Sequence, residues 1–180
     1  MARNLINEDR NYGDDELYID LIPKSCWFTN VRYCIKKKDW DILRKIIYER
    51  TNYKCECCGI DCKKEKIQIE AHERWHFDYT YKIQKLVRLI ALCKNCHLAT
   101  HYGFAKISGK EQEAYNHLLN TRKSNIEELN EHISLAYALW NERNQYDWTL
   151  DLELILKNNF EIVKPVKKEE RKKIAESKLF

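Results

Sequence analysis

The chain has 180 residues, of which 44% are hydrophobic and 33% are charged, and it contains only four glycines and two prolines. This composition excludes a disordered chain and a repeat array and favours one soluble, mostly helical globular domain. No apolar run approaches the ~18 residues that cross a membrane, and the N-terminal residues have no apolar signal core. We therefore expect a cytoplasmic protein with no membrane partner.

The N-terminal part of the chain, residues 1–52, is expected to add a strand and a helix to the core. Residues 17–22 have the composition of a strand and stop at Pro23. Asp39 is a candidate N-cap, and the apolar residues after it recur at helical spacing up to about Glu49.

The central part, residues 53–105, changes to two β-like runs, 67–71 and 86–92, joined by the aromatic segment 75–81. This pattern predicts a β-hairpin with a long loop. A helix that ends near Gly103 should follow the second run, because a residue without a Cβ suits a C-cap.

Beyond it, residues 106–163 indicate two amphipathic helices, 111–121 and 125–144, and a strand at 148–152 for which the N-terminal strand is one possible partner. Residues 164–180 hold seven Lys/Arg and three Glu, which alone accounts for the net charge of +4. This basic tail is either a solvated helix or an arm that contacts phosphate.

Four of the eight cysteines form two C-x-x-C pairs, Cys55 with Cys58 and Cys93 with Cys96. Four thiolates at ~2.3 Å around a tetrahedral Zn²⁺ are the chemistry that this spacing suits. Gly59 helps because it can take a positive φ in the first turn. A zinc held by four thiolates has no open position for substrate, so we expect it to stabilise the fold.

The other cysteines leave the ligand assignment open. Cys57 could replace either member of the first pair, and Cys62 could join the site with altered spacing. Otherwise these two thiols, together with Cys26 and Cys34, are inert.

The second cysteine pair runs directly into His97 and His101, at positions i and i+4 of one expected helix. That spacing lets two imidazoles chelate one ion. A third imidazole, His72, ends the first β-like run and would face the pair if the hairpin folds over the helix. His117 and His132 are expected to be ordinary surface residues.

The order of these motifs, C-x-x-C, a strand with His72, a second strand and C-x-x-C-H-x-x-x-H, resembles the zinc-containing HNH endonucleases over about residues 53–103. The resemblance implies an α+β, mostly helical fold, in which a ββα-metal core stapled by the four-cysteine zinc carries an N-terminal arm and helix and C-terminal helices. It also implies hydrolysis of DNA with a catalytic Mg²⁺, Mn²⁺ or other divalent cation held by His72, His97 and His101. Such an ion polarises the phosphate and stabilises the leaving 3′ oxygen.

The chain departs from the family's pattern at the general base and at the central asparagine. Family members end the first strand with a pair such as His-His or Asp-His, whose first member binds metal and whose second deprotonates water. Here the pair is His72-Glu73, with Glu73 as the base, or Ala71-His72, with His72 as the base and one ligand lost. Arg88 stands nearest to the position of the missing asparagine.

Contacts with DNA are expected from charged and aromatic residues close to the proposed ion in sequence, namely Arg74, Trp75, Lys82 and Arg88. The alternatives are an aromatic mini-core that covers the loop and, for Arg88, a strand residue that points into solvent.

Restriction, phage defence or a mobile element would each use such a core, and cutting both strands with one ion per chain favours a homodimer or a larger defence complex. The alternative to an enzyme is a non-catalytic zinc-ribbon module that binds nucleic acid or protein. In that module the four paired cysteines serve folding alone.

Overall fold

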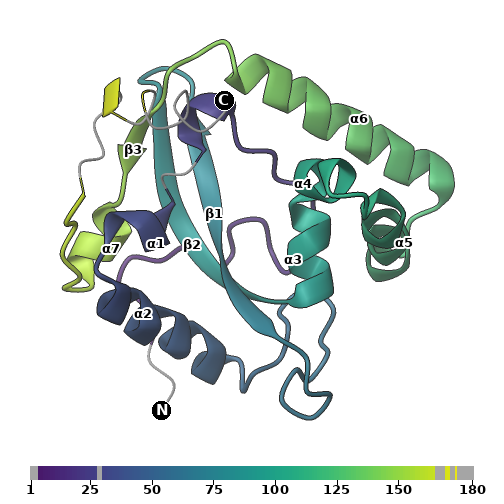
Figure 1. Ribbon diagram of the computed structural model, residues 1–180, viewed down its shortest axis with the longest axis horizontal. Helices are drawn as coiled ribbons and strands as arrows, with labels where there is room; N and C mark the ends of the chain where they lie inside the picture. The colour runs from purple at the N-terminus through teal and green to yellow at the C-terminus, as the bar shows by residue number, and fades with distance from the viewer. Residues whose placement is uncertain (1–3, 28–29, 165–168, 171–172, 174–180) are drawn as a thin grey trace.

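The computed structural model describes residues 4–27, 30–164, 169–170 and 173 of the chain. Within these residues the fold is α+β, as the sequence predicts, with seven α-helices, one short 3-10 helix and one three-stranded sheet of order β1-β2-β3 (Figure 1). The elements in chain order are η1 Lys24–Cys26, α1 Val31–Cys34, α2 Lys37–Arg50, β1 Ile69–Asp78, β2 Ile83–Cys93, α3 Lys94–Thr100, α4 Tyr102–Ile107, α5 Glu111–Arg122, α6 Ile126–Arg143, β3 Thr149–Asp151 and α7 Glu153–Lys157.

The antiparallel hairpin of β1 and β2 is longer than the sequence predicts. The prediction that residues 75–81 form a long loop is wrong, because Trp75 and Phe77 continue the two-residue alternation of β1 into a buried core. Asp78 then ends the strand, and its carboxylate accepts two backbone N–H groups of the turn at 2.8 and 3.0 Å. Only four residues, 79–82, connect the strands.

The hairpin separates two apolar cores, because successive side chains of a strand leave opposite faces. Leu89 and Ala91 of β2 pack on the side of α1, α2, β3 and α7, whereas Ile90 and Leu92 pack on the side of α3 to α6 (Figure 1). All four side chains are completely buried. A strand covered on both faces has a nearly continuous apolar sequence, which explains the run at 86–92.

The strand expected at residues 17–22 does not form, so its possible pairing with the last strand is also wrong. β3 instead pairs in parallel with the first three residues of β2. Helices take up the backbone of residues 17–22: the Asp20 N–H donates to the Thr100 carbonyl at 3.1 Å, and the Ile19 N–H donates to His132 Nε2 at 3.1 Å. These backbone N–H groups are already hydrogen-bonded to helical residues and are not available to pair with a strand.

A break at His101 divides the helix expected after the second cysteine pair. α3 ends at Thr100, His101 takes φ −86° and ψ 47°, and α4 starts with the next residue. Gly103 lies inside α4 and is not the expected C-cap. A Cβ on Gly103 would lie 3.2 Å from a methyl group of Leu21, so glycine allows the N-terminal segment to pack closely against α4.

The two C-terminal helices, α5 and α6, lie within two residues of the ranges that the sequence predicts. α6 starts with a capping box, in which the Asn125 side chain accepts the Glu128 N–H and the Glu128 side chain accepts the Asn125 N–H. Leu129 and Ala136 bury its inner face. The amphipathic pattern therefore places these helices correctly.

The basic tail predicted at residues 164–180 lies outside the described residues, apart from Lys164, 169–170 and 173. Lys164 Nζ lies 3.9 Å from the ring centroid of Tyr33. Among the helices of the described ranges, none has the length and apolar character needed to cross a membrane.

Candidate metal centres

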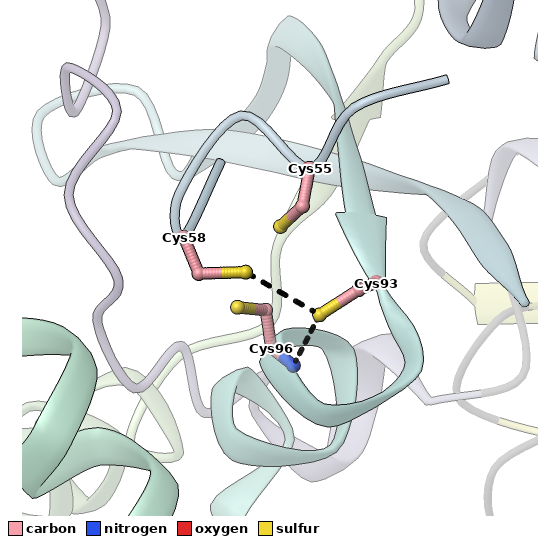
Figure 2. A group of neighbouring side chains, drawn as sticks. All are labelled: Cys55, Cys58, Cys93 and Cys96. Carbon is pink, nitrogen blue, oxygen red and sulfur yellow. Dashed lines mark hydrogen bonds between the residues drawn. The ribbon is translucent and has the colours of Figure 1, made fainter. Parts of the chain in front are cut away.

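The four cysteines of the two C-x-x-C pairs come together at the end of the hairpin. Figure 2 shows their sulfurs pointing toward one another, and the four atoms lie within 4.8 Å of one another. Cys58 Sγ lies 3.7 Å from Cys93 Sγ, and the Cys96 N–H donates to Cys93 Sγ at 3.5 Å. Four thiol groups at these distances could hold a metal ion such as zinc.

The electrostatics of the four thiols favour a cation between them. Hydrogen bonds from the other three thiols, first among them Cys58, hold the pKa of Cys55 far below its usual range. Hydrogen bonds from the same group raise the pKa of Cys96. Thiols this close cannot all ionise unless a positive ion offsets their charge.

A tight turn after α2 places the first pair. The Cys55 N–H donates to the Ile60 carbonyl at 3.0 Å, and the Gly59 N–H donates to the Cys55 carbonyl at 2.9 Å. Gly59 takes φ +74°, a conformation that costs a glycine little. The sequence prediction for Gly59 is confirmed in this respect.

The two uncertain cysteines lie outside the group of four. Cys57 Sγ is 3.7 Å from the Glu16 carbonyl and 3.8 Å from Arg74 Nη2. Cys62 is buried, with its sulfur 3.9 Å from the Ile60 carbonyl. Neither joins the set of close thiols.

Glu56, inside the first C-x-x-C pair, fastens that turn to β2. Its backbone N–H donates to the Ala91 carbonyl at 2.9 Å, and its carboxylate accepts the Ala91 N–H at 2.6 Å. The same carboxylate pairs with Arg88 Nη2 at 3.2 Å. These contacts hold the first pair beside the strand that ends at Cys93.

Three imidazoles form a second cluster on the α3 side of the hairpin. His72 lies on β1, His97 lies in α3, and His101 lies at the break between α3 and α4. The ring centroids are 5.4 Å apart for His72 and His97, 4.8 Å for His72 and His101, and 4.6 Å for His97 and His101. One ligand atom from each lies within 4.8 Å of the others, so the cluster could hold a metal ion.

Burial keeps these imidazoles neutral. Desolvation lowers the pKa of His97 and of His101 to about 4 and holds that of His72 well below its usual value. His72 is 3% exposed, and within the described residues neither of its ring nitrogens has a hydrogen-bond partner. Neutral imidazole is the form that binds metals, so the donor set fits a divalent cation.

Two carboxylates flank the cluster. Glu70 Oε2 lies 3.4 Å from His97 Nδ1. Nε2 of that ring therefore remains as the atom that can bind a metal ion. Asp20 is 5% exposed and pairs with Arg143 Nη1 at 3.0 Å. Burial and the charge of His97 lower the pKa of His101, and the charge of Asp20 acts in the opposite direction.

Glu73 does not share the face of the sheet that carries His72, because adjacent strand residues point to opposite sides. Its Oε1 accepts the Val31 N–H at 3.1 Å on the α1 side of the hairpin. Burial raises its pKa to about 7. The hypothesis that Glu73 acts as a base beside the three imidazoles therefore has no geometric support.

Most of the residues expected to contact DNA are buried or contact other side chains of the protein. Trp75 lies on β1 and is buried in the main apolar core, not in a mini-core that covers a loop. Arg74 is 0% exposed and stacks on Tyr18, with 3.7 Å from its guanidinium to the ring centroid. Lys82 lies at the hairpin turn, 3.7 Å from the ring centroid of Tyr146.

Arg88 is 1% exposed, so the alternative that it points into solvent is wrong, and its burial gives no support to the expected contact with DNA. Its guanidinium pairs with Asp15 at 2.7 Å and with Glu56 at 3.2 Å. These pairs bind the N-terminal segment and the first cysteine turn to β2. The Arg88 guanidinium therefore has a structural role in these ion pairs.

Two histidines expected at the surface make specific contacts instead. His117 Nε2 lies 3.1 Å from Cys96 Sγ, and His132 Nε2 accepts the Ile19 N–H at 3.1 Å. A signal for His117 exists in the sequence, since it lies three residues after Ala114 and one before Leu118, both buried in α5. The sequence has no comparable pattern that predicts the ion pair of Asp20 and Arg143.

Comparison of the chain with protein-family models, with curated proteins and with solved structures found no match in any of the three.

Proposed function

We propose that this chain is a metal-dependent DNA endonuclease of the HNH type, which hydrolyses phosphodiester bonds with a divalent cation at the three imidazoles. The observation that carries the proposal is His72, whose two ring nitrogens are buried without a hydrogen-bond partner in the described residues. A buried polar group left without a partner costs about 1–3 kcal/mol. A cation shared with His97 and His101 would remove that cost.

The order of the elements supports the same proposal. A strand that carries one imidazole is followed by a second strand and then directly by α3, which carries His97 and is followed at once by His101. This is the order in the motif that resembles the HNH endonucleases. The close cysteines join the end of β2 and the start of α3 to the turn before β1, so they hold hairpin and helix together.

In this proposal the neutral imidazoles of His72, His97 and His101 bind the ion, and Glu70 orients His97 through its Nδ1. The bound ion would polarise the phosphate and stabilise the leaving oxygen. The three rings come from β1, from α3 and from the break that follows α3, so the ligand set depends on how β1 packs against α3.

Water activation falls to Asp20 in this proposal, since Glu73 points to the other face of the sheet. Asp20 is a buried carboxylate that acts on His101 electrostatically and is paired with Arg143. The Arg143 guanidinium donates to Asp20 at 3.0 Å and to the Leu21 carbonyl at 3.2 Å, and a guanidinium is a side chain that can bind phosphate. A phosphate bound to Arg143 would free Asp20 to accept a proton from water.

The test is nicking of supercoiled plasmid by the zinc-loaded chain with added Mg²⁺ or Mn²⁺. His97→Ala and His101→Ala should abolish cleavage without a change in zinc content or in the circular dichroism spectrum. His76→Ala is the matched control, because His76 is an exposed histidine of the same hairpin and should cut normally.

The rival, a non-catalytic zinc-ribbon module, predicts a different outcome of the same experiment. One zinc per chain with no Mg²⁺- or Mn²⁺-dependent nicking would overturn the nuclease proposal and favour that module. Unchanged cleavage by His97→Ala would also overturn it. Equal thermal destabilisation by His97→Ala, His101→Ala and Cys93→Ser would assign the histidines to the fold.

A further inference from the structure

His117 on α5 makes a contact that the proposed hydrolysis does not use. Its Nε2 lies 3.1 Å from Cys96 Sγ. Cys96 belongs to the second C-x-x-C pair, so a side chain from a distant helix reaches the thiol cluster.

We infer that His117 is a positioning residue for the cysteine metal site, which donates its Nε2–H to the Cys96 thiolate and thereby slows loss of the metal. The inference rests on metal binding by the four cysteines, and it does not depend on the histidine cluster or on DNA cleavage. Zn²⁺ with four thiolates would carry a net charge of about −2. An N–H donor to sulfur offsets part of that charge, as charge-assisted hydrogen bonds do.

The packing of α5 explains how His117 reaches the sulfur. Ala114 and Leu118 are fully buried and pack in the same core as Ala99 of α3. The small Ala114 side chain lets the helices approach closely, and His117 lies on the adjoining flank of α5. Thr121, one turn later, places its Oγ1 3.4 Å from the same Nε2.

The tautomer follows from the partner. A thiolate offers only an acceptor, so Nε2 must carry the proton when the site is loaded. The Thr121 hydroxyl oxygen can accept a share of the same N–H. This arrangement restricts the imidazole to one orientation, which makes α5 part of the metal site although it supplies no ligand.

The experiment measures the rate at which the zinc-loaded full chain loses Zn²⁺ to a chromophoric chelator in excess. Removal of such a partner lowers metal affinity by about 10–100-fold, and we expect His117→Ala to release zinc faster by about the same factor. His117→Gln retains an N–H donor and should release zinc at a rate near that of the unsubstituted chain. His132→Ala, a histidine on α6 that contacts Ile19, is the control and should leave the rate unchanged.

His117→Leu serves as a second variant, because it fills a similar space without a donor and is expected to fold if His117→Ala does not. Zinc release at the unsubstituted rate by a folded Ala or Leu variant would overturn the inference. Equal acceleration by His132→Ala would also overturn it, since general loosening of the helices would then explain the effect. An unsubstituted chain that binds no zinc would overturn the cysteine site itself, whereas plasmid nicking reports separately on the histidine cluster.

Discussion

Replacement of Glu73 by Gln distinguishes a buried structural carboxyl group from a general base. Glu73 Oε1 accepts the Val31 N–H at 3.1 Å, on the face of the hairpin opposite His72. The amide oxygen of glutamine can accept the same hydrogen bond, so the contact with α1 survives. The substitution removes the charge and replaces one carboxylate oxygen by an N–H₂ group.

The pKa gives the expected magnitude. Burial raises the pKa of Glu73 from 4.5 to about 7, and a shift of about 2.5 corresponds to roughly 3 kcal/mol at 1.36 kcal/mol per unit. Because the folded-state pKa lies above the unfolded value, this contribution to stability is fully present below pH 4.5 and is lost as the pH rises to 7. The new amide N–H₂ costs about 1–2 kcal/mol, so Glu73→Gln should be more stable than the unsubstituted chain by about 1–2 kcal/mol at pH 8.

Urea unfolding at pH 5 and pH 8, without added Mg²⁺ or Mn²⁺, measures this difference, and plasmid nicking at pH 8 measures activity. We expect the gain in stability at pH 8 to disappear at pH 5, with cleavage near the unsubstituted rate. The same change in stability at both pH values would refute the charge-burial reasoning. Loss of cleavage in a folded variant would restore Glu73 as the base.

Three further substitutions test other contacts. Glu8→Gln should lower the free energy of unfolding by about 3–5 kcal/mol, because the ion-paired side chains of Glu8 and Arg50 are 0% and 1% exposed; an unchanged urea midpoint would contradict this. Cys93→Ser should release zinc and destabilise the fold, as mass spectrometry and thermal melting would report, and full zinc retention would remove Cys93 from the ligand set. Asp20→Asn should slow cleavage by about 10²–10⁴-fold with metal content unchanged. An unchanged rate would exclude Asp20 as the base. A melting temperature lowered enough to unfold the chain would mark its pair with Arg143 as structural.

The sequence predicts those parts of the candidate sites that depend on local spacing. Two residues separate the cysteines of each pair, and the i, i+4 spacing brings His97 and His101 together although α3 ends at Thr100. His72 needed the additional assumption that the hairpin folds over that helix, and the three rings do meet. Each of these groupings depends on one element or on two neighbouring elements.

Contacts between distant segments escaped prediction for a physical reason. The direction of the Glu73 side chain depends on strand alternation, which motif order ignores when it places the base next to the ligand. The ion pair of Asp20 and Arg143 joins residues more than 120 positions apart, and the contact of His117 with Cys96 depends on how α5 packs against α3. Such pairings follow from tertiary packing. Helical spacing can place His117 next to the buried face of α5, but propensity and spacing carry no signal for the partner that this face meets.

The two candidate metal centres are joined through α3, and the dependence between them runs in one direction. α3 has seven residues, a length at which an isolated helix is unstable in water. Cys93 is its N-cap and Cys96 lies in its first turn, so a metal held by the cysteines would fix the helix that carries His97. Loss of the cysteine metal should therefore disorder the histidine cluster as well, whereas loss of His97 or His101 leaves all four thiols in place. A chain with substituted histidines should retain its zinc, and a chain with substituted cysteines should lose both metals.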